Sequence, residues 1–112
     1  MSDKVVTPGS LLTEKEWHQT VVQVLRLRGW VLFHDTLALR SAAGYPDITA
    51  VHPVQRRVLW VEAKSTTGRV TASQERWIDA LSAAGQEVYV IRPDDHELLL
   101  RLAVARQPES SR

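Results

Sequence analysis

The chain has no cysteine among its 112 residues. This absence excludes disulfide bonds and zinc sites built from thiolates, and it suits a reducing compartment. The sequence also lacks any apolar run close to the about 20 residues that a membrane-spanning helix needs. Its first nine residues do not show the charged-then-apolar layout of a secretion signal. We therefore expect a soluble, cytoplasmic protein that acts without a membrane.

The chain also has almost no excess of charge of either sign, because its net charge is +1. Bulk electrostatics therefore do not indicate a nucleic-acid partner. The arginines nevertheless cluster in the first two-thirds of the chain, and their planar fork suits phosphate contacts. An ordinary solvated surface explains each of them equally well. They are Arg26, Arg28, Arg40, Arg56, Arg57 and Arg69.

Hydrophobic residues make up 44% of the chain and include four tryptophans, which indicates a folded globule. The length allows one domain with a modest core. Residues 1–10 contain Pro8, Gly9 and Ser10 and are expected to be a flexible lead. Residues 106–112 are a polar tail. We place the single domain at residues 11–105.

Three pairs with capping-box spacing predict the starts of three helices. They are Thr13 with Glu16, Thr71 with Gln74, and Asp94 with Glu97. Apolar residues follow the first two pairs at helical spacing, and we expect them to be buried. These are Trp17, Val21, Val24 and Leu25 in the first helix, and Trp77, Ile78, Leu81 and Ala84 in the second.

Four apolar runs predict strands at about residues 30–34, 47–52, 58–64 and 87–92. The second and third are joined by a short turn and should be antiparallel. The third reaches the fourth through the second helix, which favours a parallel, right-handed crossover. The predicted fold is α/β, in the order αβββαβ(α), with a four-stranded mixed sheet flanked by helices.

The stretch from Gly44 to Lys64 carries the chemistry. Side chains alternate along a strand, so Glu62 and Lys64 should lie on the same face. Asp47 opens the preceding strand, and pairing of the two strands can bring it to the same place. Hard divalent cations bind clustered carboxylates, and a cation with a nearby amine can hydrolyse a phosphodiester.

Each of these residues also has a purely structural explanation. An Asp after a proline commonly starts a turn, which accounts for Asp47. Glu62 and Lys64 can form an ion pair. Against this, a carboxylate inside the apolar run from Val58 to Ala63 stands where a half-buried strand prefers an apolar side chain. Neighbouring buried carboxylates raise each other's pKa, and a divalent cation relieves that repulsion.

The order of these motifs resembles the PD-(D/E)xK nucleases, and within them the VRR-NUC group of virus-type nucleases. The resemblance covers about residues 11–104. Three segments carry it, and they are Ser41-Ala42-Ala43-Gly44-Tyr45-Pro46-Asp47, Glu62-Ala63-Lys64, and Gly68-Arg69-Val70-Thr71-Ala72-Ser73-Gln74. The resemblance implies a restriction-endonuclease-like core and a bacterial or phage-infected cell.

The resemblance further implies a site for Mg²⁺ or Mn²⁺ held by Asp47, Glu62 and the backbone carbonyl of Ala63. One acid of the first helix should join them, and Glu14 is preferred to Glu16, which has a capping role. Lys64 would orient the attacking water, and whether it is also the general base stays open. Gln74 either supports the site or merely caps its helix. His18 stands where related sequences often have a glutamine.

Four residues near the loops entering this site are candidates for DNA contacts: His34, Arg40, Ser41 and Arg69. The resulting hypothesis is a metal-dependent DNA endonuclease that prefers branched DNA such as Holliday junctions and acts as a homodimer without a nucleotide cofactor. One alternative is a sequence-tolerant nickase or restriction-type nuclease on duplex DNA. Others are a catalytically silent DNA-binding module and a subunit that needs a partner protein.

Overall fold

Side chains at two helix starts satisfy backbone groups that the helices themselves leave without partners. In the computed structural model, which describes residues 12–34 and 42–104, α1 (Glu14–Leu27) and α2 (Ala72–Ala83) begin with the predicted capping boxes. The Thr13 hydroxyl accepts from the Glu16 N–H, and the Glu16 carboxylate accepts from the Thr13 N–H, at 3.0 and 2.9 Å. Each such cap stabilises a helix by about 1 kcal/mol. The prediction is confirmed for both helices.

The third helix begins differently from the prediction. A short 3-10 turn, η2 (Pro93–Asp95), comes before α3 (His96–Ala103), so Asp94 is not the N-cap of α3. The Asp95 carboxylate instead accepts from the Arg92 N–H at 2.9 Å. Proline has a fixed φ and no N–H, which suits it to the first position of such a turn. The predicted cap at Asp94 is therefore wrong.

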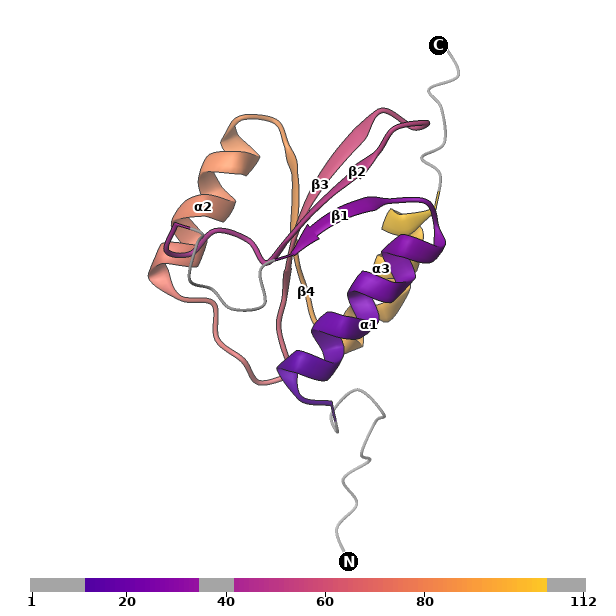
Figure 1. Cartoon of the computed structure of the whole chain (residues 1–112). Helices are drawn as coiled ribbons and strands as arrows, with labels where there is room; N and C mark the ends of the chain where they lie inside the picture. Colours follow the sequence, from indigo (N-terminus) through magenta and orange to yellow (C-terminus); the bar gives the residue numbers. More distant parts are fainter. Residues whose placement is uncertain (1–11, 35–41, 105–112) are drawn as a thin grey trace, which may run out of the picture.

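The four strands form one sheet in the order β1-β2-β3-β4. The strands are β1 (Val31–His34), β2 (Ile48–His52), β3 (Arg57–Ala63) and β4 (Glu87–Ile91). The β1–β2 and β2–β3 pairs are antiparallel, and β3 and β4 are parallel because α2 connects them. This arrangement confirms the predicted mixed α/β fold and is consistent with a restriction-endonuclease-like core (Figure 1). The predicted lead and tail lie outside the described residues.

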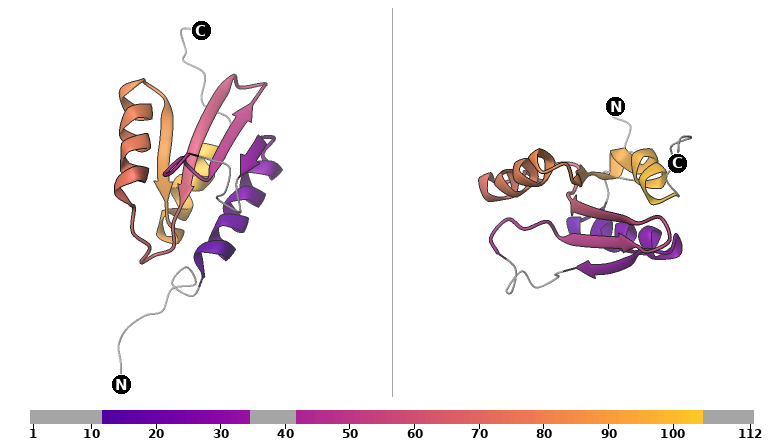
Figure 2. Two further views of the ribbon diagram at one scale, coloured as in Figure 1. Left: turned by 60° about the vertical axis from the view of Figure 1, so that its left-hand side comes forward. Right: turned by 90° about the horizontal axis from the view of Figure 1, so that it is seen from above.

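The helices lie on both sides of the sheet. Figure 1 and Figure 2 show α1 and α3 side by side on one face and α2 on the other, next to β4. The main core lies between the sheet and the α1–α3 pair, and it includes the predicted Trp17, Val21 and Leu25. Buried tryptophan N–H groups have partners there, as they should. Trp17 donates to the Ile91 carbonyl at 2.8 Å, and Trp30 donates to the Ala103 carbonyl at 3.0 Å.

The layer under α2 is thinner than the sequence predicts. Trp77, Ile78 and Leu81 are half-buried and Ala84 is exposed, so the predicted buried stripe is wrong in degree. None of the α2 residues, all of which are described, is fully buried. α2 sits beside β4 and leaves apolar side chains exposed on the rest of this sheet face. They are Val31, Phe33, Val51 and Val58.

Arg57 has a structural role, which removes it from the candidate phosphate-binding arginines. Arg57 is the first residue of β3, and its side chain lies on the sheet face that carries α3. The residue is 5% exposed. The guanidinium donates to both Glu87 carboxylate oxygens, at 3.0 and 2.7 Å, and to the Leu102 carbonyl at 3.1 Å. It also lies 5.0 Å from the centre of the Trp30 ring.

Within the described residues, no helix is long and apolar enough to cross a membrane.

Candidate active site

The pleat of β3 places Glu62 and Lys64 on the sheet face that carries α2. Both are buried, with exposed fractions of 1% and 6%. The Lys64 ammonium nitrogen lies 3.7 Å from Glu62 Oε2. Burial of two charged groups at the end of an apolar strand costs stability unless they compensate each other. The pair is therefore an energetically demanding feature in a chain of this size.

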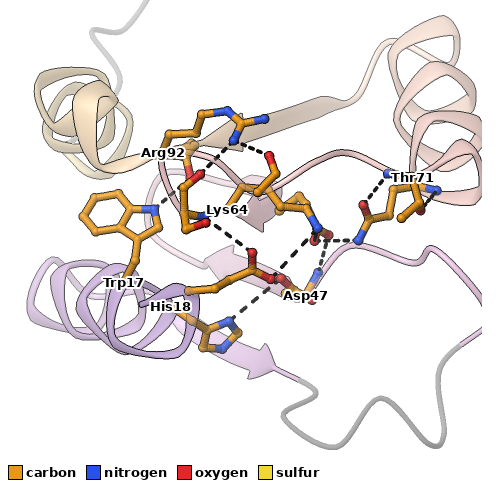
Figure 3. Close-up of polar contacts among 12 residues, drawn as sticks. Trp17, His18, Asp47, Lys64, Thr71 and Arg92 are labelled. Atoms are coloured by element: carbon orange, nitrogen blue, oxygen red, sulfur yellow. Dashed lines mark hydrogen bonds and ion pairs between the residues drawn. The ribbon is translucent and has the colours of Figure 1, made fainter. Parts of the chain in front are cut away.

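Asp47 reaches the same place because of the strand register. Ile48 at the start of β2 pairs with Val61, so Asp47 comes opposite Glu62. The Asp47 N–H donates to Glu62 Oε1 at 3.3 Å. Figure 3 shows Asp47 and Lys64 close together between the α1 side and the α2 side of the site. The structure thus brings Asp47, Glu62 and Lys64 together, as the pattern predicted.

The two carboxylates are poorly stabilised as anions. The pKa of Glu62 is raised to about 8, mainly by burial and then by the negative charge of Asp47. The pKa of Asp47 is also raised, mainly by burial. Lys64 offsets part of this effect for both carboxylates. A divalent cation between them would stabilise the charged forms more strongly.

The two acids of the first helix have different environments. Glu16 closes the capping box with Thr13. Glu14 extends toward β3, where Oε2 lies 4.0 Å from Lys64 Nζ and Oε1 accepts from the Ser65 N–H at 3.4 Å. Of the two acids of α1, Glu14 is therefore the one that lies next to Lys64, and its side chain is 47% exposed.

Gln74 both caps α2 and contacts the candidate site. Its Oε1 accepts from the Thr71 N–H at 2.8 Å, which completes the capping box of α2. Its Nε2 donates to Glu62 Oε2 at 2.9 Å. The start of α2 is thereby hydrogen-bonded directly to the buried carboxylate.

The loop before Asp47 packs tightly against α2. Gly44 has φ +82°, and a Cβ there would come within 2.3 Å of the Ser73 backbone. Tyr45 sits edge-on to Trp77 with ring centroids 4.9 Å apart, and its hydroxyl accepts from Trp60 Nε1 at 3.0 Å. These contacts fix the direction in which the chain enters β2. Sequence reasoning missed Tyr45, whose place in the motif was the available signal.

Arg92 holds the loop that follows Lys64. Its Nη1 donates to the Ser65 and Gly68 carbonyls at 2.7 and 2.6 Å. On the other side of this loop, a Cβ at Gly68 would come within 2.9 Å of Glu14 Oε1. Arg92 gave no sequence signal because α2 and β4 separate it from Lys64 along the chain. It fixes the backbone between Lys64 and α2.

The candidates for DNA contacts are only partly described. Arg40 and Ser41 lie outside the described residues, and Arg69 is exposed on the loop before α2. His34, at the end of β1, is half-buried, and its Nδ1 lies 3.3 Å from Nε2 of His18. His18 in turn lies 4.0 Å from Asp47 Oδ2. Burial, aided by His34, lowers the pKa of His18, against the effects of Asp47 and Glu14.

The donor set suits a hard cation that keeps much of its water. Among the described residues, no three His, Asp or Glu side chains are grouped closely enough to hold a metal ion as they stand. Mg²⁺ is commonly bound through one or two carboxylates, with waters completing its shell. Asp47 and Glu62 could supply two such carboxylates, and a nearby positive charge would oppose the rise in their pKa values.

The model of the VRR-NUC domain matches residues 9–95, which is most of the chain and includes all of the residues grouped above. No curated protein and no solved structure matches the chain.

Proposed function

The chain belongs to the VRR-NUC domain family, and we propose that it is an endonuclease that hydrolyses DNA phosphodiester bonds with a bound Mg²⁺ or Mn²⁺. Membership supports nuclease function and a DNA substrate. The observation that carries the metal dependence is the buried Glu62 carboxylate beside Asp47, with its pKa raised to about 8. A chain without a bound cation would gain little from keeping these two acids together.

Asp47 and Glu62 would hold the cation, with Glu14 and the backbone carbonyl of Ala63 as further ligands. The cation supplies Lewis acidity, which offsets phosphate charge and lowers the pKa of an attacking water. Every other contribution comes from groups that the fold already holds in place.

Lys64 places an ammonium group 3.7 Å from Glu62 and 4.0 Å from Glu14. In this position it orients the attacking water and stabilises the charge that develops on the scissile phosphate. Gln74 donates to Glu62 Oε2 and keeps the carboxylate turned toward the site. Arg92 holds the loop after Lys64 through two carbonyls.

The proposed substrate is branched DNA, such as a Holliday junction, and the proposed assembly is a homodimer. A two-fold dimer would present two sites to the two strands of a junction. Exposed apolar side chains on the sheet face beyond α2 favour association with another protein surface, and Phe33 among them is 58% exposed. His34, Arg40, Ser41 and Arg69 are the proposed DNA contacts, and the proposal includes no nucleotide cofactor.

Cleavage of a DNA panel tests the proposal. Four-way junction, flap, nicked and linear duplex DNA are incubated with Mg²⁺, Mn²⁺ or a chelator. We expect metal-dependent cleavage, strongest on the junction, and a loss of at least about 100-fold in Glu62→Gln and Lys64→Ala. Lys15→Ala, at an exposed position of α1, should cleave normally. Intact DNA under all conditions would contradict the proposal.

The same panel separates the rival functions. Equal cleavage of linear duplex would favour a nickase or restriction-type nuclease. Absence of cleavage together with absence of Mn²⁺ binding in calorimetry would favour a silent DNA-binding module. Light scattering distinguishes the homodimer from a monomer, and an inactive monomer would favour a subunit that needs a partner protein.

A further inference from the structure

His18 lies beside Asp47, and His34 lies on the far side of the His18 ring. His18 on α1 faces Asp47, and its Nδ1 lies 4.0 Å from Asp47 Oδ2 (Figure 3). On the other side of the ring, His18 Nε2 lies 3.3 Å from Nδ1 of His34 on β1. The His18 side chain is 12% exposed. The helix and the strand therefore hold an imidazole in a defined place next to a proposed metal ligand.

The spacing between His18 and Asp47 fits two ligands of one cation. A separation of 4.0 Å is too long for a direct hydrogen bond. Two ligand atoms that each lie about 2.1 Å from a metal ion are roughly 3 to 4.2 Å apart, depending on the angle between them. The distance from His18 Nδ1 to Asp47 Oδ2 is within this range.

The contact between the two histidines favours the required form of His18. Two imidazole nitrogens in contact need one proton between them. When His18 Nε2 carries this proton and donates it to His34 Nδ1, His18 Nδ1 keeps a lone pair on the Asp47 side. Metal-binding histidines use this arrangement, in which the other ring N–H donates to a fixed acceptor. His34 is placed to be that acceptor.

We propose that His18 is a cation ligand beside Asp47 and that His34 orients it, an inference that rests on the proposed metal-dependent function. Mg²⁺ prefers oxygen ligands, whereas imidazole nitrogen suits transition-metal ions. His18 therefore makes the site selective for a transition-metal ion such as Mn²⁺ over Mg²⁺. A glutamine at this position would fill a similar volume without supplying an imidazole nitrogen.

Mn²⁺ itself is the probe, bound to the full chain without DNA. Pulsed electron paramagnetic resonance of the wild type should show coupling of Mn²⁺ to a ¹⁴N nucleus, and His18→Gln should lose it. In calorimetry, His18→Gln should raise the Mn²⁺ Kd about tenfold, with a much smaller change for Mg²⁺.

Two further variants complete the design. His34→Phe keeps a ring but removes the acceptor, so it should weaken Mn²⁺ binding while the nitrogen coupling remains. His96→Gln changes an exposed histidine of α3 and should alter neither Kd nor coupling.

Mn²⁺ binding that depends on Glu62 but shows no nitrogen coupling in the wild type would overturn the role of His18 and leave the metal site intact. An unchanged Mn²⁺-to-Mg²⁺ preference in His18→Gln would also overturn it. Absence of Mn²⁺ binding to the wild type would overturn the metal dependence as well. Because the coupling is measured on the unaltered chain, poor folding of a variant does not weaken the test.

Discussion

At the residue scale, the environment of each side chain decides whether it can serve the site. Glu62 is 1% exposed and lies beside a second carboxylate, so its pKa is raised to about 8. Glu16, also an acid, closes a helix cap at the surface. The same residue type thus serves a buried polar cluster in one place and a surface helix cap in the other.

Gly44 is the residue at which the smallest change should have a large effect. Gly44→Ala would place a methyl group within 2.3 Å of the Ser73 backbone, and it would also strain a residue at φ +82°. Gly85 is a matched control, because it has φ +80° and nothing lies within 4 Å of its added Cβ. We expect Gly85→Ala to cost about 1 kcal/mol of unfolding free energy, from backbone strain alone.

Gly44→Ala should cost about 1–3 kcal/mol more, because the clash adds to the strain. It should also reduce cleavage, since the displaced loop carries Asp47. Urea unfolding and single-turnover cleavage measure the two effects. Equal losses of stability in the two variants would contradict the packing of this loop against α2.

At the scale of the elements, the first turn of α2 connects a helix cap to the buried Glu62 carboxylate. Gln74 uses its oxygen for Thr71 and its amide nitrogen for Glu62. Any movement of the first turn of α2 therefore changes the support of the buried carboxylate. This connection explains why an ordinary capping pair occurs close to the predicted metal ligands.

Substitutions at this cap should separate its two functions. Thr71→Ala should lower the unfolding free energy by about 1 kcal/mol and change cleavage little. Gln74→Glu keeps an oxygen for the Thr71 N–H but places a second negative charge beside Glu62. We expect it to raise the pKa of Glu62 and to lower cleavage by at least about tenfold with a smaller effect on stability. Equal effects of the two variants on cleavage would contradict the connection.

Local chemistry explains how much of the fold and site could be predicted. Capping boxes act over three residues, and strand alternation acts over two, so the starts of α1 and α2 and the Glu62–Lys64 pair could be read directly. The half-burial of Trp77 depends on which layers cover α2, which no local pattern encodes. The approach of His18 to His34 depends on how α1 packs on β1, and it could not be predicted for the same reason.

At the scale of the whole molecule, Arg57 joins elements that are distant in sequence. It contacts Glu87 on β4, the Leu102 carbonyl on α3 and the Trp30 ring before β1. These contacts lie on the sheet face opposite the one that carries Glu62 and Lys64. The molecule therefore separates a stabilising charged cluster from a functional one.

Arg57→Ala should lower the unfolding free energy by about 3–5 kcal/mol, because it removes the buried partner of an ion pair together with the hydrogen bond to Leu102 and the contact with Trp30. Arg101→Ala, at an exposed position of α3, should change it by less than about 0.5 kcal/mol. Chemical denaturation measures both, and Arg57→Ala that remains folded in the cold should still cleave DNA. A loss below about 1 kcal/mol would contradict the proposed role of Arg57.

The proposed function depends on a pair of carboxylates, half-buried Asp47 and buried Glu62, that a divalent cation would stabilise. The pKa of Glu62 is about 8 in the folded chain against 4.5 as its ordinary value, so folding favours the protonated form. This contribution to stability is fully present below pH 4.5 and is lost as pH rises through about 8. A bound cation favours the ionised form, so its stabilisation should grow over the same range.

The most direct test is urea unfolding of the wild type and Glu62→Gln between pH 4.5 and pH 8.5, with a chelator or with Mg²⁺. With the chelator, we predict that the wild type loses stability relative to Glu62→Gln as pH rises. With Mg²⁺, the wild type should recover that stability near pH 8, and Glu62→Gln should gain little. Identical pH profiles of the two chains, or no stabilisation of the wild type by Mg²⁺ at pH 8, would contradict the claim.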